Sequence, residues 1–140
     1  MKFKTAVTVI SIPILLYAAA AAVLRHALAP LCGNVALAEF PSPSRSLKAS
    51  VWVRDCGATT DFSTQVSILD ADGPSDSDSA NVLVVDGDHG RAPVGSRGGP
   101  EVRVRWESDT VLVVAYHRSA RVFRSAPKVG HVAITYEKFD

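Results

Sequence analysis

The chain has 140 residues, of which 47% are hydrophobic and 21% charged, and its formal net charge at pH 7 is +1. This near-neutral balance lacks the basic excess by which proteins attract phosphate backbones, so nucleic acid is excluded as a partner. The hydrophobic residues are concentrated near the amino terminus, and about 105 residues remain beyond them, enough for one domain with a modest core.

The first predicted element is the uncharged apolar run Thr5–Leu24. As a helix with a rise of 1.5 Å per residue it would measure roughly 30 Å, the thickness of the hydrocarbon core of a bilayer. We therefore expect residues 1–31 to form an N-terminal membrane anchor with a short linker, which contacts the membrane through residues 5–24. The alternative is a cleaved signal peptide, for which Ala27-Leu28-Ala29 offers a small-x-small cleavage site.

The charges around this run predict its orientation. Lys2, Lys4 and the amino terminus precede the run, and only Arg25 follows it closely. Positive charge is retained on the cytoplasmic side, so the amino terminus is expected in the cytoplasm and the rest outside. The sequence thus predicts a single-pass protein of a bacterial inner membrane with its domain in the periplasm or outside. Cleavage would instead give a secreted domain.

Two cysteines, Cys32 and Cys56, follow the apolar run. An even cysteine count in an exported domain predicts one disulfide, although two unrelated buried thiols remain an alternative. The bridge would close a loop of about 25 residues, worth roughly 3 kcal/mol on the chain-entropy model. A zinc site on these cysteines is poorly supported, because they form no C-x-x-C pair and no histidine lies between them.

Residues 32–140 are predicted to form an extracytoplasmic β-domain. In residues 47–54 every second residue is apolar, which is typical of a strand with one face inward. Similar segments predict seven strands in all, at 35–40, 47–54, 63–70, 81–86, 102–106, 111–116 and 129–136. Turn signals between them favour a mainly β fold, a small antiparallel β-sandwich or barrel. The Asp-, Ser- and Gly-rich segments 70–80 and 87–100 are expected to be exposed loops.

Charge is unevenly distributed along this domain. Residues 55–88 contain eight acidic residues and neither lysine nor arginine, whereas residues 89–128 contain eight basic residues and three acidic ones. This asymmetry is consistent with a polar partner surface. The alternative is that acidic and basic segments face each other within the fold, or that each is simply solvated.

The densest polar cluster lies between the second and third predicted strands, in residues 54–61. It supplies a candidate polar recognition site made of Arg54, Asp55, Thr59, Thr60 and Asp61. The alternative is a tethered turn, in which the hydroxyl side chains bond nearby backbone groups and the glycine after the second cysteine adopts a positive φ.

Several short motifs carry a resemblance to a known family. They are Cys32-Gly33-Asn34, a Ser-Pro turn, the Arg-Asp-Cys-Gly-Ala-Thr-Thr stretch of residues 54–60, and the Gly-Gly-Pro-Glu-Val stretch of residues 98–102. Together they resemble an uncharacterised family of small bacterial exported or membrane-anchored proteins over most of residues 32–137. The resemblance implies an envelope location and brings no activity. The family's turn usually continues Asp-Gly where this chain has Ser44-Arg45, which leaves the turn type open.

A second polar cluster contains Asp86, Asp88 and His89. Its Asp-x-Asp spacing before a glycine resembles part of a calcium loop, so these three residues are candidate metal ligands. A complete EF-hand loop would need a glutamate at its twelfth position, where Arg97 stands.

Neither a cofactor motif nor a G-x-S-x-G nucleophile elbow occurs in the chain, so no cofactor is predicted and catalysis is disfavoured. We expect a binding or scaffolding module of the cell envelope, with an envelope protein as its partner. The alternative is a small envelope hydrolase or metal-dependent enzyme. It would use Asp55, Asp61, Asp86, Asp88 and a histidine, and it requires that these groups share one pocket.

Overall fold

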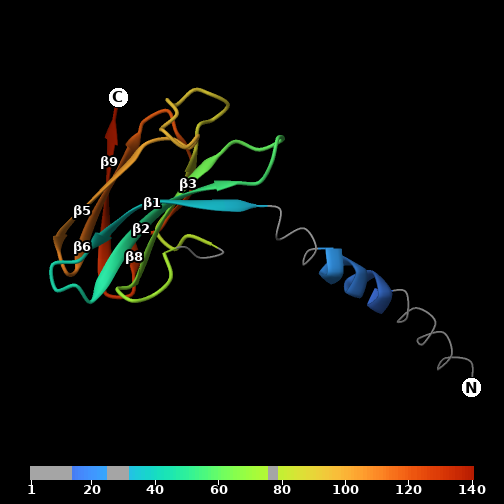
Figure 1. Cartoon of the computed structure of the whole chain (residues 1–140), viewed down its shortest axis with the longest axis horizontal. Coiled ribbons are helices and arrows are strands. Elements are labelled where there is room, and N and C mark those ends of the chain that lie inside the picture. The colour runs from blue at the N-terminus through green and yellow to red at the C-terminus, as the bar shows by residue number, and fades with distance from the viewer. Residues whose placement is uncertain (1–13, 25–31, 76–78) are drawn as a thin grey trace, which may run out of the picture. The chain divides into compact units, whose positions relative to one another are not determined.

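The computed structural model describes residues 14–24, 32–75 and 79–140. The chain divides into two compact units at Cys32, and each is considered by itself. In the first unit, residues 14–24 are helical (Figure 1). Residues 5–13 of the expected anchor lie outside the described residues, and within the described ones no helix combines the length and apolar character needed to cross a bilayer.

The second unit, Gly33–Asp140, consists of two β-sheets (Figure 1). Its described residues form nine strands: β1 (Gly33–Pro41), β2 (Leu47–Asp55), β3 (Ser63–Asp70), β4 (Leu83–Asp86), β5 (Val102–Ser108), β6 (Val111–His117), β7 (Arg121–Ser125), β8 (Lys128–Val129) and β9 (Val132–Phe139). The first sheet has the order β1-β2-β3-β4-β7 and the second β5-β6-β9-β8. Neither of these sheets closes into a barrel.

The prediction of a mainly β domain is confirmed, and each of the seven predicted strands overlaps an observed one. The predicted strand at 129–136 is divided into β8 and β9, and the structure differs in two further respects. First, β7 was missed, because all five of its residues are exposed and it therefore has no inward-facing apolar pattern. Second, β6 and β9 pair in parallel, contrary to the expected antiparallel arrangement. The chain leaves β6, adds β7 to the other sheet and returns, and a crossover of this kind permits parallel pairing.

The two sheets share one hydrophobic core. Val51, Val66 and Val85 enter it from the first sheet, and Leu112 and Val114 from the second. All five are almost completely buried. Fully burying a side chain of this size contributes about 1.5–3 kcal/mol, so the shared core is the main reason that the sheets stay together.

Tyr136 fastens the second sheet to the segments beside β4 and β7. Its hydroxyl lies 3.0 Å from the carbonyl oxygen of Val82 and 2.8 Å from that of Ala126, and its ring packs edge-on against Tyr116. Burial raises the pKa of the Tyr136 phenol to about 12. The group is therefore neutral at physiological pH and retains the proton that it donates.

Strand β2 is buried on both faces, although its alternation indicated only one inward face. Lys48, Ser50 and Trp52 on the other face are at most 7% exposed. Part of the loop after β3 contacts two of them: Lys48 Nζ donates to the carbonyl of Gly73 at 2.8 Å, and the Ser50 hydroxyl donates to the carbonyl of Ser75. The start of this loop is thus fixed by β2, in contrast to the freely exposed segment that its composition predicts.

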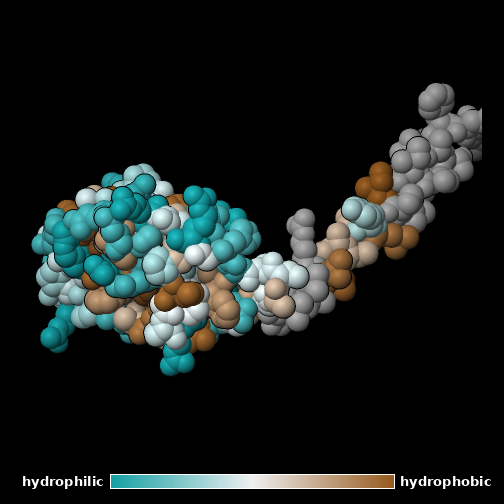
Figure 2. Space-filling view, turned by 90° about the horizontal axis from the view of Figure 1, so that it is seen from above, coloured by the Kyte–Doolittle hydropathy of each residue, from teal (hydrophilic) through white to brown (hydrophobic). Residues whose placement is uncertain are grey.

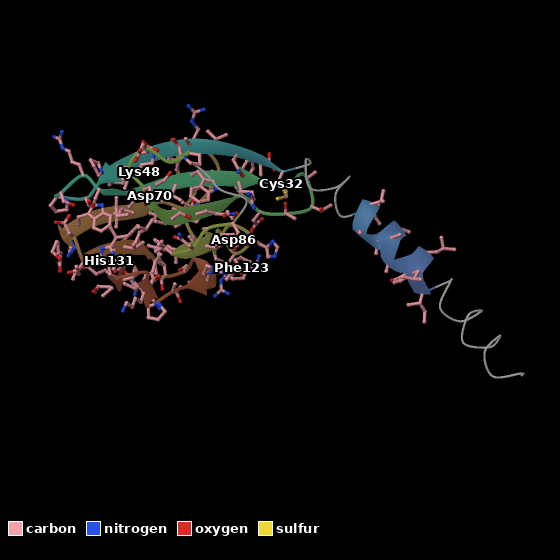
Figure 3. The ribbon with its side chains drawn as sticks, turned by 90° about the horizontal axis from the view of Figure 1, so that it is seen from below. Cys32, Lys48, Asp70, Asp86, Phe123 and His131 are labelled. Carbon is pink, nitrogen blue, oxygen red and sulfur yellow. The ribbon has the colours of Figure 1, made fainter. Side chains whose placement is uncertain are left out.

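The predicted disulfide between Cys32 and Cys56 is confirmed (Figure 3). Gly33 pairs with Asp55 across β1 and β2, so the bridge closes the end of this strand pair. It constrains the start of β1 and the polar turn that follows β2.

The structure shows the turn between β1 and β2, whose type the sequence left open. The amide of Arg45 donates to the carbonyl of Ser42 at 2.8 Å, and Arg45 has a φ of 59°. This is the left-handed region, which a residue with a Cβ enters at a cost of about 1–2 kcal/mol. Arg45 therefore adopts the backbone conformation for which glycine is best suited.

We predict that Arg45→Gly stabilises the domain. Removing the Cβ relieves the strain, and the larger entropy of the unfolded glycine chain offsets part of the gain, which leaves about 0.5–1 kcal/mol. Urea unfolding of the full chain, followed by fluorescence of the buried Trp52, measures the change. Arg45→Ala is the matched control, since it removes the same side chain but keeps the Cβ. Equal stability of the two variants would contradict the prediction.

Candidate functional site

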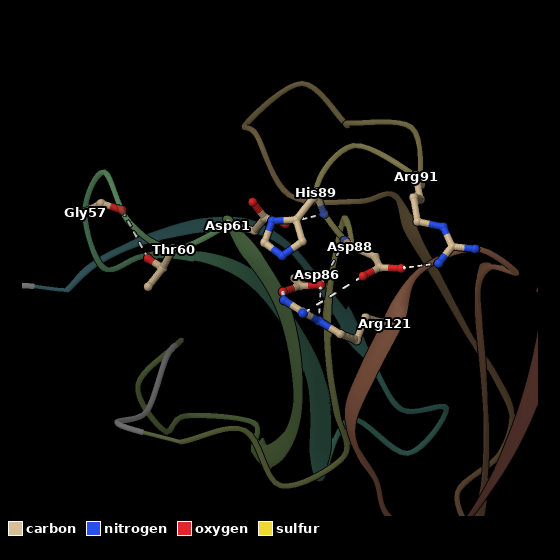
Figure 4. Close-up of polar contacts among 8 residues, drawn as sticks. All are labelled: Gly57, Thr60, Asp61, Asp86, Asp88, His89, Arg91 and Arg121. Carbon is tan, nitrogen blue, oxygen red and sulfur yellow. Dashed lines mark hydrogen bonds and ion pairs between the residues drawn. The ribbon is translucent and has the colours of Figure 1, made fainter.

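The polar turn after β2 is held by short-range hydrogen bonds. Asp55 Oδ1 accepts the amide of Gly57 at 2.8 Å, and Gly57 has a φ of 101°. The backbone amide and the hydroxyl of Thr60 both donate to the carbonyl of Gly57, each at 3.1 Å (Figure 4). The local bonding expected for a tethered turn is therefore present, and it fixes the position of the next residue, Asp61.

The loop after β4 is strained. Asp88, His89 and Gly90 all have positive φ values, of 48°, 56° and 88°. The amide of Ala92 closes the loop on the carbonyl of Gly87 at 3.0 Å. Non-glycine residues in this region cost about 1–3 kcal/mol each and persist where surrounding contacts enforce them, frequently at functional sites. The loop holds the His89 side chain outward, 74% exposed.

These two segments, far apart in sequence, meet in space (Figure 4). The amide of His89 donates to Asp61 Oδ2 at 2.7 Å, and His89 Nδ1 lies 3.7 Å from the same oxygen. Beside this contact is a hollow of about 300 Å³, lined by Arg54, Cys56, Thr59, Thr60, Asp61, Ser63, Val84, Asp86, His89, Arg121 and Phe123. Of the sequence-predicted residues, Asp55 and Asp88 are not part of this lining. We call this hollow and its rim the polar site.

An ion pair between Asp86 and Arg121 forms one wall of the polar site. Arg121 Nε donates to Asp86 Oδ1 at 3.1 Å, and a second guanidinium nitrogen donates to Oδ2 (Figure 4). The Asp86 side chain is only 5% exposed. Burial alone would raise its pKa, but the Arg121 hydrogen bonds and charge and the bond from the Asp88 amide hold the pKa of Asp86 below its ordinary value. The Asp86 hydrogen bonds in turn raise the pKa of Arg121.

Sequence reasoning did not single out Arg121. The β4–β7 register places it directly opposite Asp86, and that register is visible only once β7 is identified as a strand. The two residues are 35 positions apart. The sequence did indicate that the acidic residues of 55–88 could pair with the basic residues of 89–128. It did not indicate which residues form the pair.

Exposed apolar side chains surround the polar site. Phe123 on β7 is 61% exposed, and the Arg121 guanidinium carbon lies 4.9 Å from its ring centroid. On the other side of Asp61, a second hollow of about 260 Å³ is lined by Thr60, Asp61, Phe62, Gly87, Gly90, Val94 and Gly98. Asp61 and Thr60 thus separate two hollows, each with an aromatic residue in its wall.

The Gly-Gly-Pro segment before β5 supports Phe62. A Cβ at Gly98 would lie 2.9 Å from Phe62 Cγ, and Gly98 has a φ of 94°, so both space and backbone require glycine here. The hydroxyl of Thr64 donates to the carbonyl of Pro100 at 2.7 Å and fastens the same segment to β3.

The geometry gives no support to the metal hypothesis for Asp86, Asp88 and His89. Asp86 is paired with Arg121, and Asp88 Oδ2 accepts a hydrogen bond from Arg91 at 3.1 Å. Among the described residues, no three or more His, Cys, Asp or Glu side chains are grouped so that they could hold a metal ion.

The second sheet carries a separate groove of about 250 Å³ on its outer face. The short side chains of Val113 and Ala115 on β6 lie between longer ones on β5 and β9. Arg105 pairs with Glu137 at 2.8 Å, and the guanidinium of Arg103 lies 4.1 Å from the centroid of the Phe139 ring. Arg103 also pairs with Glu101 at 2.7 Å, so both arginines of β5 have acidic partners within the fold.

No protein-family model, curated protein or solved structure matches the chain. The resemblance to small exported proteins therefore stays a prediction.

We predict that Asp86→Asn destabilises the domain by about 1.5–3 kcal/mol at pH 7, because it weakens a buried charge-assisted pair. The depressed pKa of Asp86 means that the pair contributes stability above the ordinary value of 3.8 and loses it as the pH falls through the folded-state pKa. The difference between variant and wild type should therefore shrink in acid. Urea unfolding over a pH series measures it.

Asp72→Asn serves as the control, since it removes the same charge from an exposed loop position. A difference for Asp86→Asn that stays constant down to acid pH, or that matches the control, would contradict the assigned ion pair.

Proposed function

We propose that this protein is a membrane-anchored binding module of the cell envelope, and that its β-domain docks a partner protein through the polar site. The observation that carries the proposal is the meeting of two separate polar segments, joined by the bond from the His89 amide to Asp61, around a hollow of about 300 Å³. The predicted anchor and the disulfide support the envelope location.

The surroundings of the polar site favour a protein as its ligand. The exposed large hydrophobic side chains in the described part of the domain are Val35 and Leu37 on β1, and Phe62, Val94, Val122 and Phe123 from the segments around the polar site. In the view of Figure 2, the surface of the domain is largely hydrophilic with a few hydrophobic patches. Exposed aromatic residues beside arginine are typical of the energetic centre of protein–protein interfaces.

The proposal is tested by site-specific photo-crosslinking in intact cells. The test position is Val94, which is 67% exposed and lines the second hollow, and that hollow shares Thr60 and Asp61 with the polar site. A benzoylphenylalanine in place of Val94 should form an adduct with a specific envelope protein. The control replaces Thr135, an exposed residue of β9 on the other sheet. Identical adducts from both positions, or none from Val94, would count against docking at this surface.

The hydrolase alternative loses Asp55 and Asp88, which do not line the hollow, and it now rests on one observation. Asp61 lies beside His89 Nδ1 in a hollow that also contains the hydroxyls of Thr59, Thr60 and Ser63. The 3.7 Å separation is longer than a hydrogen bond, and a small shift that brings the carboxylate within reach of Nδ1 would let it orient the imidazole as a general base. This candidate predicts that the full chain cleaves peptidoglycan or model esters, and that Asp61→Asn and His89→Gln each abolish the cleavage. A wild-type chain that releases no product would eliminate it.

A further inference from the structure

Strand β7 forms one outer edge of the first sheet. It pairs with β4 and stands last in the strand order, and all five of its residues are exposed. An outermost strand presents backbone amide and carbonyl groups along its free side, which is a template for another extended chain. Because Arg121 and Phe123 of β7 also line the polar site, a chain added here would lie directly beside the hollow.

The local geometry of β7 turns an aromatic side chain toward the hollow. In the β4–β7 register, Val84 lies opposite Arg124 and Val85 opposite Val122, so Phe123 is the extra residue of a bulge. The bulge leaves Phe123 without a partner on β4. Phe123 lies two positions after Arg121, so strand alternation points both side chains to the same face, and both line the hollow. An apolar side chain of an added strand would find this ring exposed.

The charge around β7 specifies the chemistry of its occupant. Residues 118–128 contain four basic residues, Arg118, Arg121, Arg124 and Lys128, and no acidic one. Arg118 pairs with Asp140 at 2.7 Å and Arg121 with Asp86. Arg124 and Lys128 are exposed and enter no ion pair with the described residues. The edge is therefore positively charged and complementary to an acidic strand.

We propose that the partner binds by adding an extended, acidic segment to β7, with a carboxylate on Arg124 and an apolar side chain against Phe123. This inference rests on the proposed docking function and specifies which kind of partner segment binds. A second copy of this chain fits the edge poorly, because β7-to-β7 pairing would bring Arg121 and Arg124 of two copies together.

The test begins with selection from a random-peptide display library on the full chain in detergent. Enriched peptides should alternate acidic and apolar residues, and replacing their Asp and Glu by Asn and Gln should weaken binding at least tenfold. Bound peptide should slow amide hydrogen exchange in residues 121–125. Arg124→Glu should abolish binding and Arg124→Ala should weaken it. Arg105→Glu, on the outer face of the other sheet, should leave it unchanged.

Several results would overturn the inference. These are a selection without acidic enrichment, exchange protection on β1 in place of β7, binding indifferent to Arg124→Glu, or self-association of the chain that Arg124→Glu abolishes. Its failure is distinguishable from that of the docking function, because the Val94 crosslink does not involve β7. If a partner crosslinks at Val94 but β7 is not protected, only the proposal of an added acidic strand is rejected. If neither the crosslink nor the protection is seen, docking is rejected as well.

Discussion

The polar site depends on the ion pair between Asp86 and Arg121. Strand β7 buries none of its five residues, so hydrophobic packing contributes little to its place in the sheet. Its attachment comes from backbone pairing with β4, from the Tyr136 hydrogen bond to Ala126 at its end, and from this charge-assisted contact, whose carboxylate is almost completely buried. A buried carboxylate that lost its cation would be costly, and this cost fixes Arg121 in one place. Arg121 in turn lies beside Phe123 and sets the wall of the hollow.

The disulfide and backbone hydrogen bonds fix the part of the polar site that the segments after β2 and β4 form. The disulfide and the Gly57 turn limit the positions open to the segment after β2, and the bond from the His89 amide to Asp61 joins that segment to the loop after β4. The positive φ values of Asp88 and His89 show that this loop is held in a conformation that it would not favour alone. The result is a preorganised surface, and preorganisation lowers the entropy cost of binding a partner.

Part of the charge asymmetry of the sequence is neutralised within the fold, and part of it is left on the surface. Asp86 from the acidic half pairs with Arg121 from the basic half, so part of the asymmetry is neutralised across strands. Arg105 and Glu137 do the same on the second sheet. The basic segment that ends at Lys128 is only partly neutralised, because Arg118 and Arg121 have acidic partners among the described residues whereas Arg124 and Lys128 do not.

The sequence by itself determined the strands that have an apolar face, the disulfide between the only two cysteines, and the two polar segments, because alternation, cysteine count and turn chemistry are local signals. It also predicted the anchor, whose residues 5–13 lie outside the described part of the chain. Only the tertiary structure decided that β7 exists, that β6 and β9 run parallel, and that Arg121 completes the polar site. These features arise from pairing between residues far apart in the chain. Arg121 meets Asp86 across 35 positions, and no local pattern records a contact at that separation.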